Sequence, residues 1–178
     1  RVLPDVPQVA CFDTAFHAQL PPAAATYALP REWRERWGLR KYGFHGLSHA
    51  YAARRAAELS RRSDPPASLA RFRVVTCHLG AGASLAAVLG GRSIDTTMGF
   101  TPLDGLVMGT RAGSVDPGIL LWLAVEQGVP LADLRDGLEH RSGLVGLAGT
   151  PDMRAVLAGA ATGLEPQRLA REVYLHRL

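Results

Sequence analysis

Three strand-like runs in series constrain the fold of this chain most strongly. RFRVVTCH begins at Arg71, ASLAAVL at Ala83 and RSIDTTM at Arg92. All three contain β-branched or small apolar residues, and only Leu-Gly-Ala-Gly and Gly-Gly steps separate them. Gaps this short permit only tight hairpins, so the sequence predicts a three-stranded antiparallel meander.

Helix signals stand on both sides of this meander. GLSHAYAARRAAELSRR, from Gly46 to Arg62, is rich in alanine and arginine, and Ser48 is a possible N-cap. Asp116 followed by Pro117 has the form of a helix start, and Gly128 is placed to end that helix. A second helix is expected from Pro130, and the C-terminal PQRLAREVYLHRL also has helical composition.

Two further segments complete the expected organisation. QVACFD, from Gln8 to Asp13, is short and apolar and ends in an acid, as in a buried strand that delivers a side chain at its carboxyl end. SDPPAS, from Ser63 to Ser68, is expected to be a loop or linker. The order of strand, helix, linker, meander and helices indicates an α/β chain with a boundary near residue 45 or 65.

Composition excludes several classes of protein. The 178 residues are 47% hydrophobic, enough to bury a core, but no apolar run approaches the roughly 20 residues of a membrane helix, so no membrane partner is expected. The net charge of +4 comes from arginines mixed with acids, as in REWRERWGLRK, which argues against nucleic-acid binding. Cys11 and Cys77 form no metal or disulfide pattern, which is typical of a reducing cytoplasm.

Both ends of the sequence look like cuts in a longer protein. The chain begins at Arg1 without a start methionine or a signal peptide, and its last helical segment lacks a stop signal. We therefore expect a fragment.

The glycines of HLGAGASL have two open interpretations. A dinucleotide-binding or Walker loop would need a helix directly afterwards, whereas ASLAAVL continues as a strand. An ordinary hairpin turn remains, or a turn whose backbone N–H groups point into one concavity and bind an anion. His78 at the end of the preceding strand favours the anion site.

Four motifs together carry a family resemblance. FDTAFH, YGFHGLSH, VVTCHLGAGAS and DTTMGFTPLDGLVMGTRAGSVDPG, in this order, resemble the acetate and propionate kinase family. The resemblance implies the actin, hexokinase and Hsp70 type of fold (ribonuclease H-like), with ATP between two α/β domains. It implies that residues 1–45 end the first domain, 46–69 form an interdomain helix and linker, and 70–178 form the front of the second, nucleotide-binding domain.

The resemblance also implies site residues and a reaction. ATP and acetate would give ADP and acetyl phosphate, with Mg²⁺ accompanying the nucleotide. Asp13, His45 and Arg111 match the catalytic positions, and Phe44 and Pro102 match the wall around the substrate methyl group. The positions that match nucleotide contacts are His78, Leu79, Gly80, Ala81, Gly82, Asp152, Met153 and Arg154. The full-length protein would be a cytoplasmic homodimer.

Several alternatives stay open at this stage. Propionate or butyrate could replace acetate, because one or two methylenes change binding by only about 1–3 kcal/mol. The chain could instead be an inactive nucleotide-binding remnant. Because it is a fragment, we expect it to have no catalytic activity by itself. His45 and His49 have the i, i+4 spacing of metal ligands, but Gly46 stands where a zinc hydrolase has glutamate, so no metal ligand is assigned. Ala81 stands where the family's hairpin usually has asparagine. Because the side-chain amide is missing, we expect weaker binding of the nucleotide's phosphates.

Overall fold

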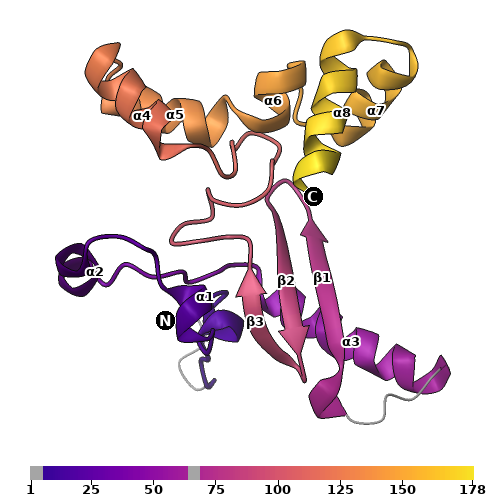
Figure 1. Cartoon of the computed structure of the whole chain (residues 1–178). Coiled ribbons are helices and arrows are strands. Elements are labelled where there is room, and N and C mark those ends of the chain that lie inside the picture. The colour runs from indigo at the N-terminus through magenta and orange to yellow at the C-terminus, as the bar shows by residue number, and fades with distance from the viewer. Residues whose placement is uncertain (1–5, 64–68) are drawn as a thin grey trace.

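The computed structural model describes residues 6–63 and 69–178 of the chain (Figure 1). A three-stranded sheet with one long helix on its face forms one part, and a group of short helices lies beyond one end of the strands. Most of the expected SDPPAS linker lies outside the described residues.

The sheet is the predicted antiparallel meander. Strands β1 (Arg73–Leu79), β2 (Ala83–Leu89) and β3 (Arg92–Thr96) pair in the order β1-β2-β3. Leu79 pairs with Ala83 and Leu89 with Arg92, so the connecting loops have three and two residues. The two-residue loop is Gly90–Gly91, with φ of 58° and 81°, as a turn of type I′ requires. Both hairpins expected from the sequence are confirmed.

Helix α3 (Gly46–Ser63) covers one face of the sheet, as predicted from its composition. Ala53 of α3 packs with Ala86 and Val88 of β2, and these three side chains are buried. The prediction that Ser48 caps this helix is wrong, since Ser48 is its third residue. The helix entry is held instead by the N–H of Gly46, which donates to the Asp13 carbonyl at 2.8 Å.

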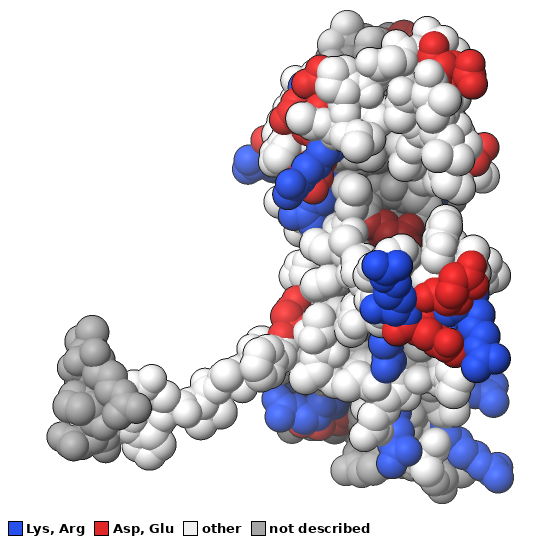
Figure 2. All heavy atoms as spheres, turned by 90° about the vertical axis from the view of Figure 1, so that its left-hand side faces the viewer, with Lys and Arg blue, Asp and Glu red and all other residues white. Residues whose placement is uncertain are grey.

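The predicted strand from Gln8 to Asp13 does not form. These residues have no regular secondary structure and are exposed, with Val9 84% exposed. None of the described strands pairs with them, and an extended segment without a partner makes no ladder of hydrogen bonds. In Figure 2 the described part of this segment, drawn mostly in white, extends away from the body of the molecule. The 3-10 helix η1 (Ala15–His17) follows directly.

The remaining helices largely confirm the sequence signals. Asp116 caps α4 (Pro117–Leu121) by accepting from the Gly118 N–H at 2.8 Å, and α4 runs on as the π-helical η3 (Trp122–Glu126) up to Gly128. The other helices are α1 (Pro22–Ala25), α2 (Arg31–Trp37), the 3-10 helix η2 (Leu69–Arg71), α5 (Leu131–His140), α6 (Gly143–Ala148), α7 (Met153–Ala161) and α8 (Glu165–Arg177).

Two apolar clusters connect the sheet with these helices. One contains Met98 and Met108 packed on Ala83 of β2, and the other contains Val107, packed among residues of α6, α7 and α8. The irregular segment from 97 to 116 contributes to both clusters, so it is held across the β1–β2 hairpin end of the sheet. Arg111 lies on this segment.

Two properties of the described residues concern membrane insertion and nucleic-acid binding. Over 6–63 and 69–178, no helix is long and apolar enough to cross a membrane. The face shown in Figure 2 carries both blue cationic and red anionic side chains, with mainly cationic ones at its lower end.

Candidate active site

Asp13 and His45 are joined through the backbone. The main-chain N–H of His45 donates to Oδ2 of Asp13 at 2.6 Å, and the next N–H, of Gly46, donates to the Asp13 carbonyl. His45 has φ of +57°, the one positive value among non-glycine residues of the described chain. Such a conformation is uncommon outside glycine and persists where neighbouring contacts hold it.

The ring of His45 is held from two sides. It stacks on His78 of β1, with 4.0 Å between ring centroids and 21° between planes. Its Nδ1 lies 2.8 Å from Oγ of Ser84 on β2, and the Nδ1 of His78 lies 2.9 Å from Oγ of Ser48. Ser48 therefore positions a histidine of the site.

A buried polar layer lies behind these rings. Nε2 of His49 shares the Ser84 hydroxyl at 2.8 Å, and Nδ1 of His49 lies 2.8 Å from Oγ1 of Thr76. His17 is fully buried between Oγ of Ser93 and the Phe44 carbonyl, at 2.8 and 3.1 Å. Two histidines and three hydroxyls thus fix the sheet side of the site.

Burial and mutual repulsion favour neutral rings here. Burial lowers the pKa of His49 to about 4, and the nearby His17, His45 and His78 act in the same direction. The pKa of His45 is also lowered, first by burial and then by His78 and Arg111, while Asp13 opposes the change. Burial likewise lowers the pKa of His17.

Arg111 reaches the same place from the irregular segment. Its Nη1 donates to the carbonyl of Pro102 at 3.2 Å and lies 3.8 Å from the sulfur of Met108. A Cβ placed on Gly82 would lie 3.3 Å from Nη1 of Arg111 and 3.4 Å from Nε2 of His45. The absence of a side chain at position 82 therefore lets the hairpin approach both groups closely.

The β1–β2 hairpin loop presents main-chain donors. The Gly80 N–H donates to the Gly82 carbonyl at 3.0 Å, and the Ala81 carbonyl accepts from Gly109 at 3.1 Å. Within the described part of the chain, the N–H groups of Ala81 and Gly82 have no hydrogen-bond partner. Two fixed, unused N–H donors are what an anion-binding turn requires.

A pocket of about 600 Å³ lies on the other side of this loop. Five of the predicted nucleotide contacts line it: Leu79, Gly80, Ala81, Asp152 and Met153. Gly82 and His78 instead face the histidine side, and Arg154 is exposed and paired with Asp152 at 3.0 Å. Asp152 also caps α7 by accepting from the Arg154 N–H at 2.9 Å.

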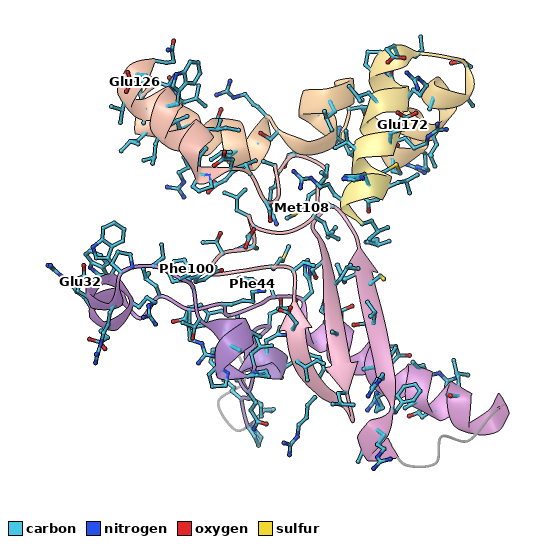
Figure 3. The ribbon with its side chains drawn as sticks, viewed as in Figure 1. Glu32, Phe44, Phe100, Met108, Glu126 and Glu172 are labelled. Carbon is cyan, nitrogen blue, oxygen red and sulfur yellow. The ribbon has the colours of Figure 1, made fainter. Side chains whose placement is uncertain are left out.

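The two predicted substrate-wall residues lie near the same loop. Phe44 is half-buried against the cluster that contains Met98 and Met108, and Figure 3 shows Phe44 beside the end of β3 and Met108 above the strands. Pro102 is half-buried, and its carbonyl holds Arg111. The structure thus brings the two residues to the side on which His45 and Arg111 lie.

Sequence reasoning missed the hydroxyls that hold the histidines. Ser84 and Thr76 are polar residues at buried positions of otherwise apolar strands, 0% and 5% exposed. A polar residue on the buried face of a strand needs a partner, which is the signal that could have found them. Met108, Tyr174 and Arg171, which line the 600 Å³ pocket, carried no such signal.

The whole chain matches one protein family. Residues 1–178 match the family described as the Acetokinase family. The chain belongs to the acetokinase family. The resemblance drawn from the four motifs is therefore confirmed.

Relatives of this acetokinase chain are similar along its whole length. It is 54% identical over 179 aligned residues to the acetate kinase of Microcystis aeruginosa, and 49% identical to that of Deinococcus radiodurans. These alignments cover 100% of the chain but only 43% and 44% of the relatives, so the chain spans less than half their length.

Solved structures of the family have the same arrangement. An acetate kinase from Porphyromonas gingivalis matches with a TM-score of 0.91 at 38% identity, and a propionate kinase from Francisella tularensis with 0.90 at 44% identity. Each match covers 99% of the chain, and 43% and 44% of the respective solved chains. The mixed helix and sheet structure is thus that of acetate and propionate kinases.

Proposed function

We propose that this chain carries the transfer site of a short-chain carboxylate kinase that converts ATP and acetate to ADP and acetyl phosphate. The observation that carries the proposal is the close approach of Arg111 and His45 to Gly82 of the glycine loop. This loop borders a pocket of about 600 Å³. Cationic and N–H donors on one side and a pocket on the other suit a nucleotide whose last phosphate meets a second substrate.

The nucleophile in this proposal needs no general base. A short-chain carboxylic acid has a pKa of about 4, so acetate is already ionised at neutral pH. One of its oxygens attacks the γ-phosphorus directly and in line, the bond from phosphorus to the β,γ-bridging oxygen breaks, and ADP leaves. The barrier is the approach of two anions, so catalysis depends on positive charge, donors and alignment.

The site residues divide this work. Arg111 has one nitrogen engaged with Pro102, and its other guanidinium donors are available for the equatorial oxygens of the transferring phosphoryl. The free N–H groups of Ala81 and Gly82 would hold phosphate oxygens. His45 would hydrogen-bond the phosphoryl through Nε2, and Asp13 holds the backbone of His45.

Acetate is the substrate we propose, with propionate or butyrate as the alternative. The acetate kinases of Microcystis aeruginosa and Deinococcus radiodurans are 54% and 49% identical to this chain, whereas the solved propionate kinase is 44% and the solved acetate kinase 38% identical. Phe44 and Pro102 are apolar and half-buried, as a wall around a methyl group requires.

Mg²⁺ would accompany the nucleotide. Among the described residues, no group of three His, Cys, Asp or Glu side chains is placed to hold a metal ion. Magnesium in kinases is held largely by phosphate oxygens and water, and the exposed carboxylate of Asp13 fits a contact to such a water. The ion would supply positive charge to the phosphates when bound.

The larger architecture follows from the same proposal. We infer an actin, hexokinase and Hsp70-like fold of two domains, in which residues 1–45 end the first, 46–69 connect, and 70–178 begin the second. Ala53 of α3 packs on Ala86 and Val88 of β2, which fixes this connecting helix to the sheet of the second domain. We also propose a cytoplasmic homodimer for the full-length protein.

A hydroxylamine trap tests the reaction. The complete gene product is incubated with ATP, magnesium and either acetate, propionate or butyrate, and the acyl hydroxamate is measured. We expect the largest kcat/KM with acetate. A larger value with propionate or butyrate would replace the substrate, and no hydroxamate with any acid from a folded protein would leave the inactive nucleotide-binding remnant.

A further inference from the structure

A continuous chain of hydrogen bonds runs from the sheet into the site. Oγ1 of Thr76 donates to the Ala86 carbonyl at 3.4 Å and lies 2.8 Å from Nδ1 of His49. Nε2 of His49 lies 2.8 Å from Oγ of Ser84, which lies 2.8 Å from Nδ1 of His45. The far nitrogen of His45, Nε2, lies 3.4 Å from the position of a Cβ on Gly82, and Nη1 of Arg111 lies 3.3 Å from the same point.

The middle of this row of hydrogen bonds is buried away from solvent. His49 is 1% exposed, Ser84 0% and Thr76 5%. In the described part of the structure, no buried side-chain nitrogen or oxygen lacks a partner. Since each hydroxyl has a single hydrogen and each neutral imidazole has one N–H, the direction of one bond fixes the direction of all the others.

The bond at Thr76 sets this direction. The Ala86 carbonyl, at 3.4 Å, can only accept, and if Thr76 gives its hydrogen there, its oxygen accepts from the Nδ1–H of His49 at 2.8 Å. The opposite nitrogen of the neutral His49 then accepts from the Ser84 hydroxyl, and Ser84 accepts from the Nδ1–H of His45. The low pKa of His49 agrees with a neutral ring in this position.

The surroundings of Nε2 of His45 favour the same tautomer. Nη1 of Arg111 and Nε2 of His45 both lie close to the position of a Cβ on Gly82. The nearby positive charge of Arg111 favours a lone pair on Nε2 of His45 over an N–H, whose positive end would add to that charge.

We propose that Thr76, His49 and Ser84 are positioning residues that hold His45 as the Nδ1–H tautomer, with Nε2 as its one ring atom able to exchange a proton with the site. For its catalytic meaning the inference rests on the proposed kinase function. It then follows that His45 donates to the phosphoryl group only after Nε2 has taken up a proton.

The tautomer can be read without any turnover. The complete protein is labelled with ¹⁵N-histidine, and long-range ¹H–¹⁵N correlation at pH 8 identifies the protonated nitrogen of each ring, with His45 assigned by loss of its signals in His45→Asn. We expect His45 to be protonated at Nδ1. A wild-type ring protonated at Nε2 would overturn the proposal, because the chain of bonds would then run the other way.

Thr76→Val tests whether the far end of the chain controls the tautomer. Valine has the shape of threonine without the hydroxyl, so Nδ1 of His49 loses its acceptor. We expect His49 to move its proton to Nε2, Ser84 to reverse, and His45 to become the Nε2–H tautomer. Thr76→Ser keeps a hydroxyl and should preserve the wild-type signals.

The outcomes separate this inference from the kinase proposal. A folded Thr76→Val protein whose His45 stays protonated at Nδ1 would refute control by Thr76. If Thr76→Val does not fold, the wild-type tautomer and its preservation in Thr76→Ser still decide the direction. The hydroxamate assay tests the kinase reaction, and the spectrum tests the tautomer of His45. Either result can contradict its own claim without affecting the other.

Discussion

The backbone N–H of His45 donates to Oδ2 of Asp13 at 2.6 Å while His45 occupies the left-handed region at φ +57°. This bond helps to hold His45 in the conformation in which its ring contacts Ser84 and His78. Positioning the ring is therefore a structural role of Asp13 that does not require proton transfer by its carboxylate.

The pair Asp13→Ala and Asp13→Asn tests this role. Alanine removes the acceptor, and we expect the free energy of unfolding to fall by about 1 kcal/mol. Asparagine offers an oxygen in the same place and should retain most of that stability. Urea unfolding of both variants measures the difference, and equal losses in the two would show that the bond to His45 does not hold the loop.

Arg111→Lys should abolish most of the transfer activity. Lysine keeps the charge but cannot contact the Pro102 carbonyl and also fork onto two phosphoryl oxygens. We expect kcat in the hydroxamate assay to fall by about 10²-fold or more, in line with the contribution of transition-state arginines to phosphoryl transfer. Arg31→Lys, an 81% exposed arginine on α2, is the matched control and should leave kcat unchanged. A kcat for Arg111→Lys above a tenth of wild type would contradict the assigned role.

Ala81→Asn should tighten nucleotide binding. The Ala81 carbonyl is already fixed by Gly109, and the residue is exposed and lines the pocket, so an added amide would point into existing space. One new hydrogen bond is worth about 1 kcal/mol, which predicts a roughly fivefold lower KM for ATP. Ala81→Leu adds a side chain of similar size without the amide and should not lower KM. An unchanged KM for Ala81→Asn would show that the main-chain donors suffice.

The buried histidines make stability depend on pH. His49 has a pKa of about 4 in the folded chain against 6.5 when exposed, so the unfolded chain binds more protons between these values. The stability from its neutral form is therefore complete above pH 6.5 and is lost as pH falls toward 4, by about 3 kcal/mol at most. The lowered pKa values of His17 and His45 act in the same direction.

Urea unfolding at pH 7.5 and pH 5 measures this loss. His49→Asn removes the titrating ring and should flatten the dependence, at a lower stability at pH 7.5. A wild-type midpoint that does not change between the two pH values would contradict a neutral, buried His49.

The meander and the helices could be predicted because their signals are local. Glycine steps fix the hairpins, and Asp116 with Pro117 fixes the start of α4. The prediction of a strand from Gln8 to Asp13 was wrong because apolar composition does not show whether a partner strand is present. A strand is stabilised by its neighbours, so composition alone did not predict its conformation.

The candidate site could also be predicted only in part from the sequence. Asp13, His45 and Arg111 stand in motifs that could be recognised in the sequence, and the structure places His45 and Arg111 beside Gly82 and joins Asp13 to the backbone of His45. The contacts among them depend on distant segments: Ser84 lies 39 residues from His45, and Pro102 holds Arg111 through its carbonyl. No local pattern predicts which hydroxyl will meet which ring.

The three-residue loop between β1 and β2 separates two environments. On one side Gly80 and Ala81 border the large pocket, and on the other Gly82 touches the space beside His45 and Arg111. Its conformation is locked by bonds from Gly80 to Gly82 and from Gly109 to Ala81. The pocket and the space beside His45 and Arg111 therefore lie on opposite sides of one fixed loop, and under the proposed function a nucleotide bound in the pocket would have to extend its phosphates past this loop to meet Arg111.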